Sequence, residues 1–213
     1  MPEPRVSHPI FARFWIAVSP KMDRGGAVEH RRRLLAGLSG EVIEVGAGNG
    51  LNFAHYPREV TGVLAVEPEP RLRAAASVNA AQAPVLISVV PGVADRVPAG
   101  DGSVDAVVYS LVLCSVPDVA RALREARRVL RPGGQVRFLE HVRAETGGLK
   151  RVQQWLDATI WPYVGAGCHC GRDTTAAIEM AGFAIERLER FRFPDIRVPM
   201  PTSPHVLGVA RPV

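Results

Sequence analysis

The sequence predicts an α/β fold with a seven-stranded, mostly parallel sheet, helices on both faces and a C-terminal antiparallel hairpin. Apolar stretches rich in Val, Ile and Leu alternate with helical stretches through residues 41–140, the pattern of a parallel sheet buried on both faces. Near the C-terminus, two apolar stretches are separated only by a Pro-rich loop, 194–204. Because this loop leaves no room for a crossover helix, those two strands must pair antiparallel.

Hydrophobic periodicity and breakers place the elements in order. We expect helices at 27–38, 70–82, 118–130, 149–160 and 173–181, a short helix after residue 50, and strands at 41–46, 62–67, 85–90, 104–110, 135–140, 183–191 and 205–210. The helix at 118–130 has the clearest signal, since apolar residues from Val119 to Leu130 recur at i, i+3, i+4 and i+7. The "RPGG" stretch that follows, 131–134, is a breaker before the next strand.

Composition limits the function classes. The 213 residues are enough for one domain, and 47% hydrophobic with 22% charged residues is ordinary for a globular protein. No apolar run reaches the roughly 20 residues that span a bilayer, and the stretch 9–20 contains Arg13, so it reads as neither signal peptide nor anchor. The odd set Cys114, Cys168 and Cys170 favours a reducing compartment, and we expect a cytoplasmic protein.

The net charge of +5 raises nucleic acid or an anionic membrane as partners. The basic clusters at 31–33 and 121–131 fall on predicted amphipathic helices, where a solvated face is the commoner explanation. Many enzymes that modify the amino groups of nucleic acid bases carry a polar residue followed by Pro-Pro-aromatic after the fourth strand of such a sheet. This chain has "YSLVLCSV" there, so we expect no nucleic acid partner.

The stretch "EVIEVGAGNG", 41–50, runs a strand into alternating glycines. Such a turn places backbone N–H groups at the carboxyl end of the sheet. The dinucleotide pattern G-x-G-x-x-G would require Gly where Leu51 stands, and the acidic Glu44 within the strand would repel a pyrophosphate. The carboxylate of Glu44 instead suits an ammonium group or backbone donors, and Glu67, 17 residues after Gly50, suits ribose hydroxyls. The order strand, glycines, helix, strand, acid is typical of class I S-adenosylmethionine methyltransferases.

The resemblance to that family covers nearly the whole chain. It is carried by "EVIEVGAGNGLNFAHYP", "AVEP", "GDGSVDAVVYSLVLCSV", "ALREARRVLRPGGQVRFLEHV" and "SPHVLGVA". These stretches resemble the methyltransferase-domain (type 11) subgroup that includes the methyltransferase-like alkyl thiol S-methyltransferases of animals. They are more distantly similar to ubiquinone/menaquinone C-methyltransferases and phosphatidylethanolamine N-methyltransferases. The resemblance implies the Rossmann-like class I fold, S-adenosyl-L-methionine as cofactor and a small-molecule acceptor.

The resemblance also assigns positions. Residues expected to bind the cofactor are Glu44, Gly46, Ala47, Gly48, Asn49, Gly50, Asn52, Glu67, Pro68, Val93, Ala94, Asp95, Ser110, Leu111 and Val112. In relatives an acid that follows a Gly after the third strand often contacts the adenine amino group. Here Gly92 is followed by Val93 and the acid is displaced to Asp95, so backbone groups near Ala94 are the alternative adenine contact.

One domain, 1–213, is expected, with a helical lid at 1–38, a cofactor-binding core at 39–141 and acceptor-side helices with the hairpin at 142–213. In this fold the aromatic residues of the N-terminal and 155–163 segments belong to the lid over the acceptor; an apolar acceptor follows if they line a pocket. Candidate substrate-binding residues are Phe14, Trp15, Cys114, Trp161 and His169. Animal members begin with a membrane anchor that this sequence lacks, which suggests a soluble substrate or peripheral membrane contact.

Methyl transfer is an in-line displacement that mainly requires alignment of the acceptor and exclusion of water. A thiol ionises easily, whereas an amine must lose a proton and a phenol or carbon acid needs a base. His141, directly after the fifth strand, is the candidate base or orienting group, and a structural histidine is its alternative; for His205 the structural role is favoured. The stretch "GCHCGRD", 167–173, offers too few ligands at awkward spacing for zinc, so no metal is expected.

The sequence therefore predicts a S-adenosylmethionine-dependent methyltransferase, with S-methylation of a thiol as the preferred reaction. N-, O- or C-methylation of a lipid-like amine, phenol or quinone is the alternative within enzymes. A non-catalytic cofactor-binding protein and a nicotinamide dehydrogenase are the alternatives from other classes. The oligomeric state is not predicted.

Overall fold

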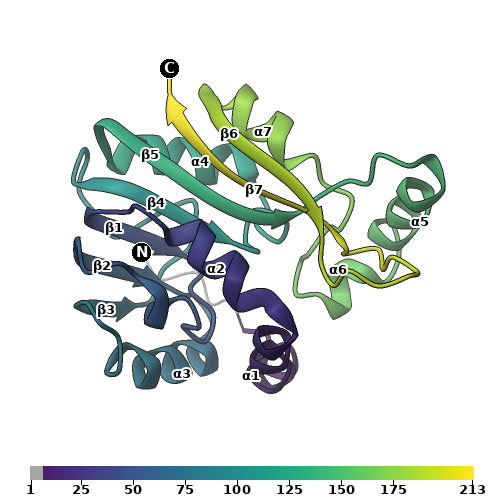
Figure 1. The fold of residues 1–213 in the computed structure, drawn as a ribbon, viewed down its shortest axis with the longest axis horizontal. Helices are drawn as coiled ribbons and strands as arrows, with labels where there is room; N and C mark the ends of the chain where they lie inside the picture. Colours follow the sequence, from purple (N-terminus) through teal and green to yellow (C-terminus); the bar gives the residue numbers. More distant parts are fainter. Residues whose placement is uncertain (1–6) are drawn as a thin grey trace.

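The computed structural model describes residues 7–213 and contains a seven-stranded sheet of order β3-β2-β1-β4-β5-β7-β6 (Figure 1). Its strands are β1 (Gly40–Val45), β2 (Val60–Val66), β3 (Ile87–Val90), β4 (Val104–Ser110), β5 (Leu130–His141), β6 (Phe183–Arg192) and β7 (Pro204–Pro212). Strands β1 to β5 are parallel, and β7 runs antiparallel to both β5 and β6. The predicted parallel sheet with a terminal antiparallel hairpin is confirmed.

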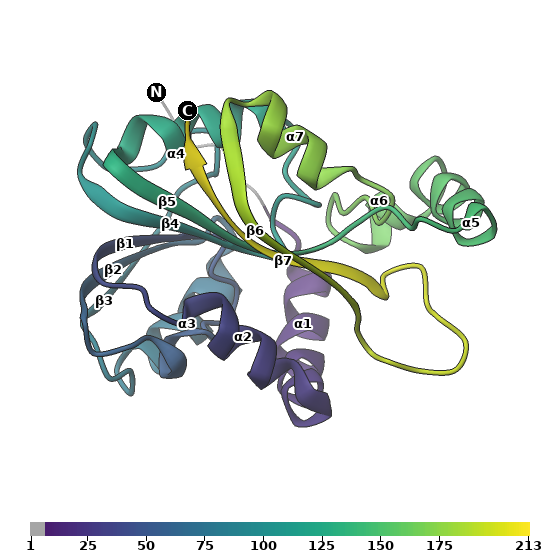
Figure 2. The same ribbon diagram turned by 45° about the horizontal axis from the view of Figure 1, so that its top comes forward.

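Helices cover both faces of this sheet, with α4 and α7 on one face and α1, α2 and α3 on the other (Figure 2). Their bounds are α1 (Pro9–Met22), α2 (Val28–Leu35), α3 (Pro70–Ala80), α4 (Val119–Val129), α5 (Gly147–Asp157), α6 (Trp161–Val164) and α7 (Thr174–Met180). Helices α5 and α6 project beyond one end of the sheet, together with the loop between β6 and β7. No helix among residues 7–213 combines the length and apolarity needed to cross a membrane.

Two hydrophobic clusters fill the space between the helices and the sheet. Side chains alternate along β4, so that Val107 and Tyr109 join the cluster under α4 and α7, whereas Ala106 and Val108 join the cluster under α2 and α3. All four are fully buried. This two-sided burial explains why the parallel strands are near-continuous runs of apolar residues.

Capping side chains fix where three of the helices begin. The carboxylate of Glu69 accepts hydrogen bonds from the first turn of α3, Asp118 does the same for α4 and Asp173 for α7. Such caps satisfy backbone N–H groups that have no partner within the helix.

Two of the differences from the sequence prediction concern β5 and the segment after the glycines. β5 begins at Leu130 directly after α4, because the 131–134 breaker forms an irregularity within the strand: Leu130 pairs with Val104, and the next pair is Gln135 with Ala106. After the glycines the chain forms only a short 3₁₀ turn, Phe53–His55, instead of an α-helix. Neither change moves the strand ends that carry the site.

Candidate active site

The glycine turn after β1 adopts a conformation that side chains would obstruct. Gly46, Gly48 and Gly50 all have positive φ, at 67°, 59° and 79°, a region that favours glycine. A Cβ on Gly46 would lie 2.6 Å from a methyl group of Val112, and one on Gly48 would lie 3.4 Å from Nε1 of Trp15 on α1. The alternating glycines therefore let the chain turn tightly beneath α1.

Glu44 is buried at the end of β1, directly before this turn. Its two oxygens accept hydrogen bonds from Nδ2 of Asn52 and from the hydroxyl of Tyr56, both at 2.7 Å. Burial raises the pKa of Glu44 to about 7, although these two hydrogen bonds and the charge of Arg31 oppose the rise. A cation placed against Glu44 would stabilise its ionised form.

Arg31 of α2 connects the N-terminal region to this carboxylate. Its Nη1 donates to Oδ1 of Asn52 at 2.9 Å, and its Nε pairs with Asp23 at 2.9 Å. The chain Asp23–Arg31–Asn52–Glu44 is thus continuous from the turn after α1 to the glycine loop. Sequence analysis missed Arg31 and Tyr56 as site residues, because Arg31 lies 21 residues from its partner Asn52.

Glu67 follows β2 and lies beside the glycine turn. One of its oxygens accepts the N–H of Gly48 at 2.8 Å and the other accepts the N–H of Glu69 at 2.9 Å. Burial raises its pKa to about 7, despite these hydrogen bonds. The structure therefore brings the two sequence-predicted acids, Glu44 and Glu67, to opposite sides of one backbone turn.

A small cavity opens at this turn and contains about 30 Å³ of free volume. Its lining residues are Trp15, Arg31, Glu44, Gly46, Ala47, Gly48, Asn49, Leu51, Asn52, Ser110 and Leu111. The hydroxyl of Ser110 is buried without a hydrogen-bond partner among the described residues. Buried polar groups normally have partners, so this orphaned hydroxyl is available to a ligand.

These groups fit the expected cofactor. The buried carboxylate of Glu44 and the unpartnered hydroxyl of Ser110 line the cavity and suit a ligand that carries an ammonium group, whereas Glu67 is bonded to the glycine turn but lies outside the lining. A phosphate would meet the Glu44 carboxylate, so the cavity lining disfavours a dinucleotide. Residues Glu44 and Glu67 would hold the cofactor's cationic and ribose parts respectively.

Several predicted cofactor residues lie outside the cavity lining. Val112 packs behind Gly46, and Gly50 lies against the ring of Phe53. In the loop after β3, Val93 bridges to Arg96, Ala94 packs on the core, and Asp95 forms an ion pair with Arg121 at 3.6 Å. The role of this loop in adenine binding stays a prediction.

A second, mostly apolar cavity adjoins the first and shares Arg31, Ser110 and Leu111 with it. Its other lining residues are Met22, Ala27, His30, Leu139, Phe191, Phe193 and His205. Burial lowers the pKa of His205 to about 4 and also lowers that of His30. Both imidazoles are therefore neutral at pH 7.

Glu140, the penultimate residue of β5, holds the backbone turn that follows β4. Its buried carboxylate accepts N–H groups of Val112 and Leu113, each at 2.9 Å, and of Cys114 at 3.3 Å. These bonds hold the turn after β4, in which Leu111 has a φ of 60°. Sequence analysis missed Glu140, although an acid inside an apolar strand was a usable signal.

His141 is not among the lining residues of either cavity. Its Nε2 lies 3.2 Å from Sγ of Cys168, and the Cys114 thiol completes a buried group of three. Its ring lies edge-on to His205, with ring centroids 6.1 Å apart. The role of His141 as a base stays a prediction. Of the two histidines, it is His205 that lines the second cavity.

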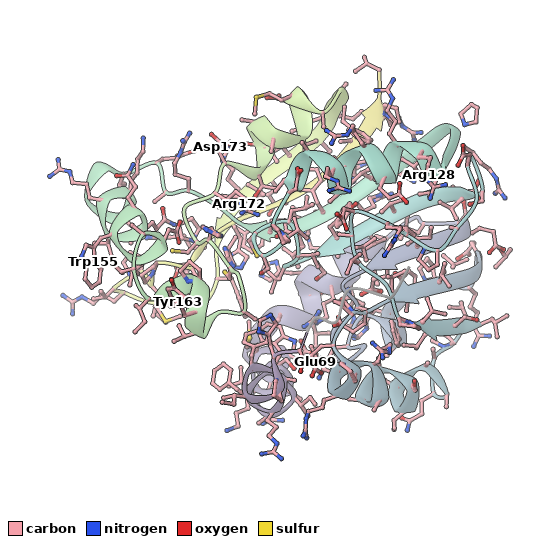
Figure 3. The ribbon with its side chains drawn as sticks, turned by 180° about the vertical axis from the view of Figure 1, so that it is seen from behind. Glu69, Arg128, Trp155, Tyr163, Arg172 and Asp173 are labelled. Atoms are coloured by element: carbon pink, nitrogen blue, oxygen red, sulfur yellow. The ribbon has the colours of Figure 1, made fainter. Side chains whose placement is uncertain are left out.

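Of the predicted substrate-binding residues, only Trp15 lines one of the two cavities. Trp15 lines the first cavity, whereas Phe14 is 58% exposed. Trp161 donates from Nε1 to Sγ of Cys168 at 3.2 Å, and the backbone N–H of His169 donates to the carbonyl of Cys114 at 2.8 Å. Trp155 and Tyr163, on the projecting helices α5 and α6, are largely exposed (Figure 3).

Comparison with known proteins agrees with this geometry. A family profile described as "Methyltransferase domain" matches residues 43–138. The thiol S-methyltransferase TMT1B of Homo sapiens is 37% identical over 182 residues, which cover 83% of this chain and 73% of that protein. The ubiquinone/menaquinone biosynthesis C-methyltransferase UbiE of Caulobacter vibrioides is 37% identical over 106 residues, covering 50% of this chain and 39% of UbiE.

Solved structures share the fold at low sequence identity. A S-adenosylmethionine-dependent methyltransferase from Thermotoga maritima has a TM-score of 0.69 at 22% identity, covering 94% of this chain and 97% of that one. The [4+2]-cyclase SpnF has a TM-score of 0.69 at 19% identity, covering 89% of this chain and 81% of SpnF. Because one of these neighbours is named a cyclase, the fold by itself does not determine the reaction.

Proposed function

The chain belongs to the methyltransferase domain family and is a S-adenosylmethionine-dependent methyltransferase, and we propose that it methylates the sulfur of a small, apolar thiol. The observation that carries the proposal is its 37% identity, over 83% of its length, to an enzyme named as a thiol S-methyltransferase. The chemistry of the two adjoining cavities supports it independently.

The first cavity would hold the cofactor. When bound, S-adenosylmethionine supplies a methyl group on a positively charged sulfur. The buried carboxylate of Glu44 favours the positive charge of the amino-acid part, and Glu67 is placed for hydroxyl groups beside the Gly48 N–H. Ser110 and Leu111 line both cavities and so form the passage between cofactor and acceptor.

The second cavity favours a neutral or anionic acceptor over a cationic amine. Among the described residues its lining contains no carboxylate, and it does contain Arg31, whose guanidinium is paired with Asp23. A nearby positive charge lowers the pKa of a thiol and so favours the nucleophilic thiolate. The neutral His30 and His205 add no charge that would repel an apolar substrate. An acceptor that ionises without a strong base matches this environment.

Entry of the cofactor would require movement of the N-terminal region. A free volume of about 30 Å³ holds only one or two water molecules. Trp15 of α1 lies against Gly48, and Ser19 of α1 accepts a hydrogen bond from Nδ2 of Asn49 at 3.0 Å. We therefore assign α1 the role of a lid, in keeping with the predicted division into a lid at 1–38, a core at 39–141 and an acceptor side at 142–213.

Methylation of a quinone carbon is the second candidate, because the UbiE match reaches 37% identity. That match covers only half of this chain and 39% of UbiE. A carbon acid also needs a general base, and the low pKa of His205, about 4, makes it a weak one. The thiol is therefore preferred.

A turnover assay tests the proposal. The protein is supplied with S-adenosylmethionine and separate thiol, amine, phenol and quinone acceptors, and S-adenosylhomocysteine is measured. We expect product with apolar thiols and little with amines of matched size. Turnover on a quinone or a lipid amine alone would overturn thiol methylation and leave the cofactor assignment standing.

A further inference from the structure

We propose that Cys114, His141 and Cys168 form a binding site for a zinc-class divalent cation beside the acceptor cavity. The two sulfur atoms and Nε2 of His141 lie within 4.8 Å of one another, and the His141–Cys168 pair is separated by 3.2 Å. A tetrahedral zinc ion, with bonds of about 2.3 Å to sulfur and 2.0 Å to nitrogen, holds S···S at about 3.8 Å and S···N at about 3.5 Å. The three atoms thus need only small shifts to bind a metal.

The donor set specifies the class of cation. Thiolate sulfur and imidazole nitrogen select zinc-like metals, whereas magnesium and calcium prefer oxygen. Two cysteines and one histidine supply three of the four tetrahedral positions. The fourth is left for water or an exogenous ligand, an arrangement known in zinc sites with an open position.

The backbone around the cysteines is already fixed in place. Glu140 holds the N–H of Cys114, and the carbonyl of Cys114 accepts the N–H of His169 at 2.8 Å. The indole of Trp161 donates to Sγ of Cys168 at 3.2 Å. Hydrogen bonds of this kind orient the ligands of metal sites and stabilise thiolate charge.

Arg172 fastens the two cysteine-bearing segments to each other. Its Nη1 donates to the carbonyl of Leu113 at 2.6 Å and to that of Val116 at 2.8 Å. Figure 3 shows Arg172 in the segment that leads from the projecting helices to α7. The turn containing Cys114 and the turn containing Cys168 therefore cannot separate without loss of several hydrogen bonds.

Hydrogen bonding among the three side chains is a weaker explanation of the cluster. All three residues are buried, at 1% exposure for Cys114 and 7% for His141 and for Cys168. Thiols are poor hydrogen-bond donors and poor acceptors, so the trio gains little from its own contacts. A metal ion would bind both sulfur atoms and Nε2 of His141 at once, and Nδ1 of His141 would keep its present lack of a hydrogen-bond partner among the described residues.

The sequence did not reveal this site because its ligands are distributed along the chain. Residues 167–173 alone supply too few ligands, and the others come from the turn after β4 and from the end of β5. A bound metal would join these segments on the acceptor side of the sheet. The site is independent of the thiol reaction, and its test does not require turnover.

The test measures metal on the untagged full chain, purified without chelators. We expect one zinc ion per chain by elemental analysis. After replacement by cobalt, we expect thiolate-to-cobalt charge-transfer absorption and the intense visible bands of tetrahedral cobalt. Cys168→Ala and Cys114→Ala should each lose the metal and these bands. Cys170→Ala is the matched control, because Cys170 is a buried cysteine two residues away that bonds to Asp157 and not to the cluster.

The alternatives give different results. Metal-free protein that takes up no cobalt, or a Cys114–Cys168 disulfide in freshly purified protein, would overturn the site, as would equal metal loss in Cys170→Ala. Affinity for S-adenosylmethionine is measured in every variant and reports whether the chain is still folded. If neither cysteine variant folds, the metal content and the cobalt spectrum of the wild-type protein decide whether the metal site exists. Stoichiometric metal without thiol turnover would support the site and sink the proposed function, and thiol turnover by a metal-free chain would do the reverse.

Discussion

The cofactor cavity and the Cys114–His141–Cys168 cluster lie at the same edge of the sheet, but they are built differently. Most of the cofactor cavity comes from one short stretch, Glu44 to Asn52, at the end of one strand. The cluster takes its three side chains from turns and a strand end that are separated by 27 residues each in sequence. The geometry of the cofactor cavity is set mainly by local backbone conformation. The geometry of the cluster is set mainly by the packing of segments that are distant in sequence.

This difference has physical consequences. In the glycine turn, the backbone itself makes the site, so a single added methyl group should disturb ligand binding directly. On the acceptor side, side chains hold distant segments together, so their loss should appear first as reduced stability. Substitutions in each region should therefore separate loss of ligand binding from loss of stability.

Gly46→Ala should nearly abolish cofactor binding. The new Cβ would lie 2.6 Å from Val112 at a φ of 67°, and the clash with backbone strain should lower the free energy of unfolding by about 2–4 kcal/mol. Calorimetric titration with S-adenosylmethionine and chemical unfolding check this. Gly147→Ala is the control, because no atom lies within 4 Å of its Cβ position and its φ is not positive. Equal effects at both glycines would contradict the account.

Gln153→Ala should destabilise the acceptor side without a comparable loss of cofactor affinity. Buried Gln153 accepts the N–H of Ala144 at 2.7 Å, and its Nε2 lies within hydrogen-bond distance of the carbonyls of Val142, Cys170 and Pro201. Unpaired buried groups left behind cost about 1–3 kcal/mol each, so a loss of about 2–4 kcal/mol is expected in urea unfolding.

Gln154→Ala is the matched control for that change, since the neighbouring Gln154 is exposed. It should alter stability by less than about 0.5 kcal/mol. If Gln153→Ala instead weakened cofactor binding more than it weakened folding, the separation of the two regions would fail.

Glu67→Gln should weaken cofactor binding by about 1–3 kcal/mol, because a carboxylate that accepts hydrogen bonds becomes an amide that cannot accept them all. Asp95→Asn should change the affinity little, since the side chain of Asp95 is partly exposed and is paired with Arg121 at 3.6 Å. Titration of both variants with S-adenosylmethionine gives the comparison. If Asp95→Asn lowered the affinity more than Glu67→Gln does, the loop after β3 would be the more important part of the cofactor site, as expected if it binds the adenine.

Cofactor affinity should fall as the pH is lowered below 7. The pKa values of Glu44 and Glu67 are both raised to about 7 by burial, so below that pH protons compete with a cationic ligand. We expect the dissociation constant to rise up to about tenfold per pH unit for each group that must ionise. Calorimetry between pH 5.5 and 8, flanking that pKa of about 7, checks this, and a flat profile would contradict it.

The stability of the ligand-free protein should depend on pH in the opposite direction, and should fall as the pH rises. Because the folded pKa of each group exceeds its ordinary value of 4.5, the folded state binds more protons than the unfolded state between these values. The stabilisation is complete below pH 4.5 and is lost as the pH rises through about 7, by up to about 3 kcal/mol per group. Unfolding at several pH values, with and without cofactor, separates this linkage from binding.

The sequence predicted the parts of the molecule that depend on local pattern. The succession of strands and helices, Glu44, the alternating glycines and Glu67 were all readable from local patterns and from their spacing along the chain. Arg31 and Tyr56 were not, since their contacts with the site depend on how α2 and the segment after the 3₁₀ turn pack. Cys168 was dismissed together with residues 167–173, because only the fold brings Cys114 and His141 to it.

The most direct test of the central assignment uses one acceptor that carries both a thiol and a hydroxyl group, such as 4-mercaptophenol. The protein is incubated with S-adenosylmethionine whose methyl group is deuterated, and the labelled product is identified by mass spectrometry and NMR. The account predicts the label on sulfur, as a thioether. A label on oxygen, with sulfur left free, would contradict thiol methylation while leaving the cofactor cavity as described.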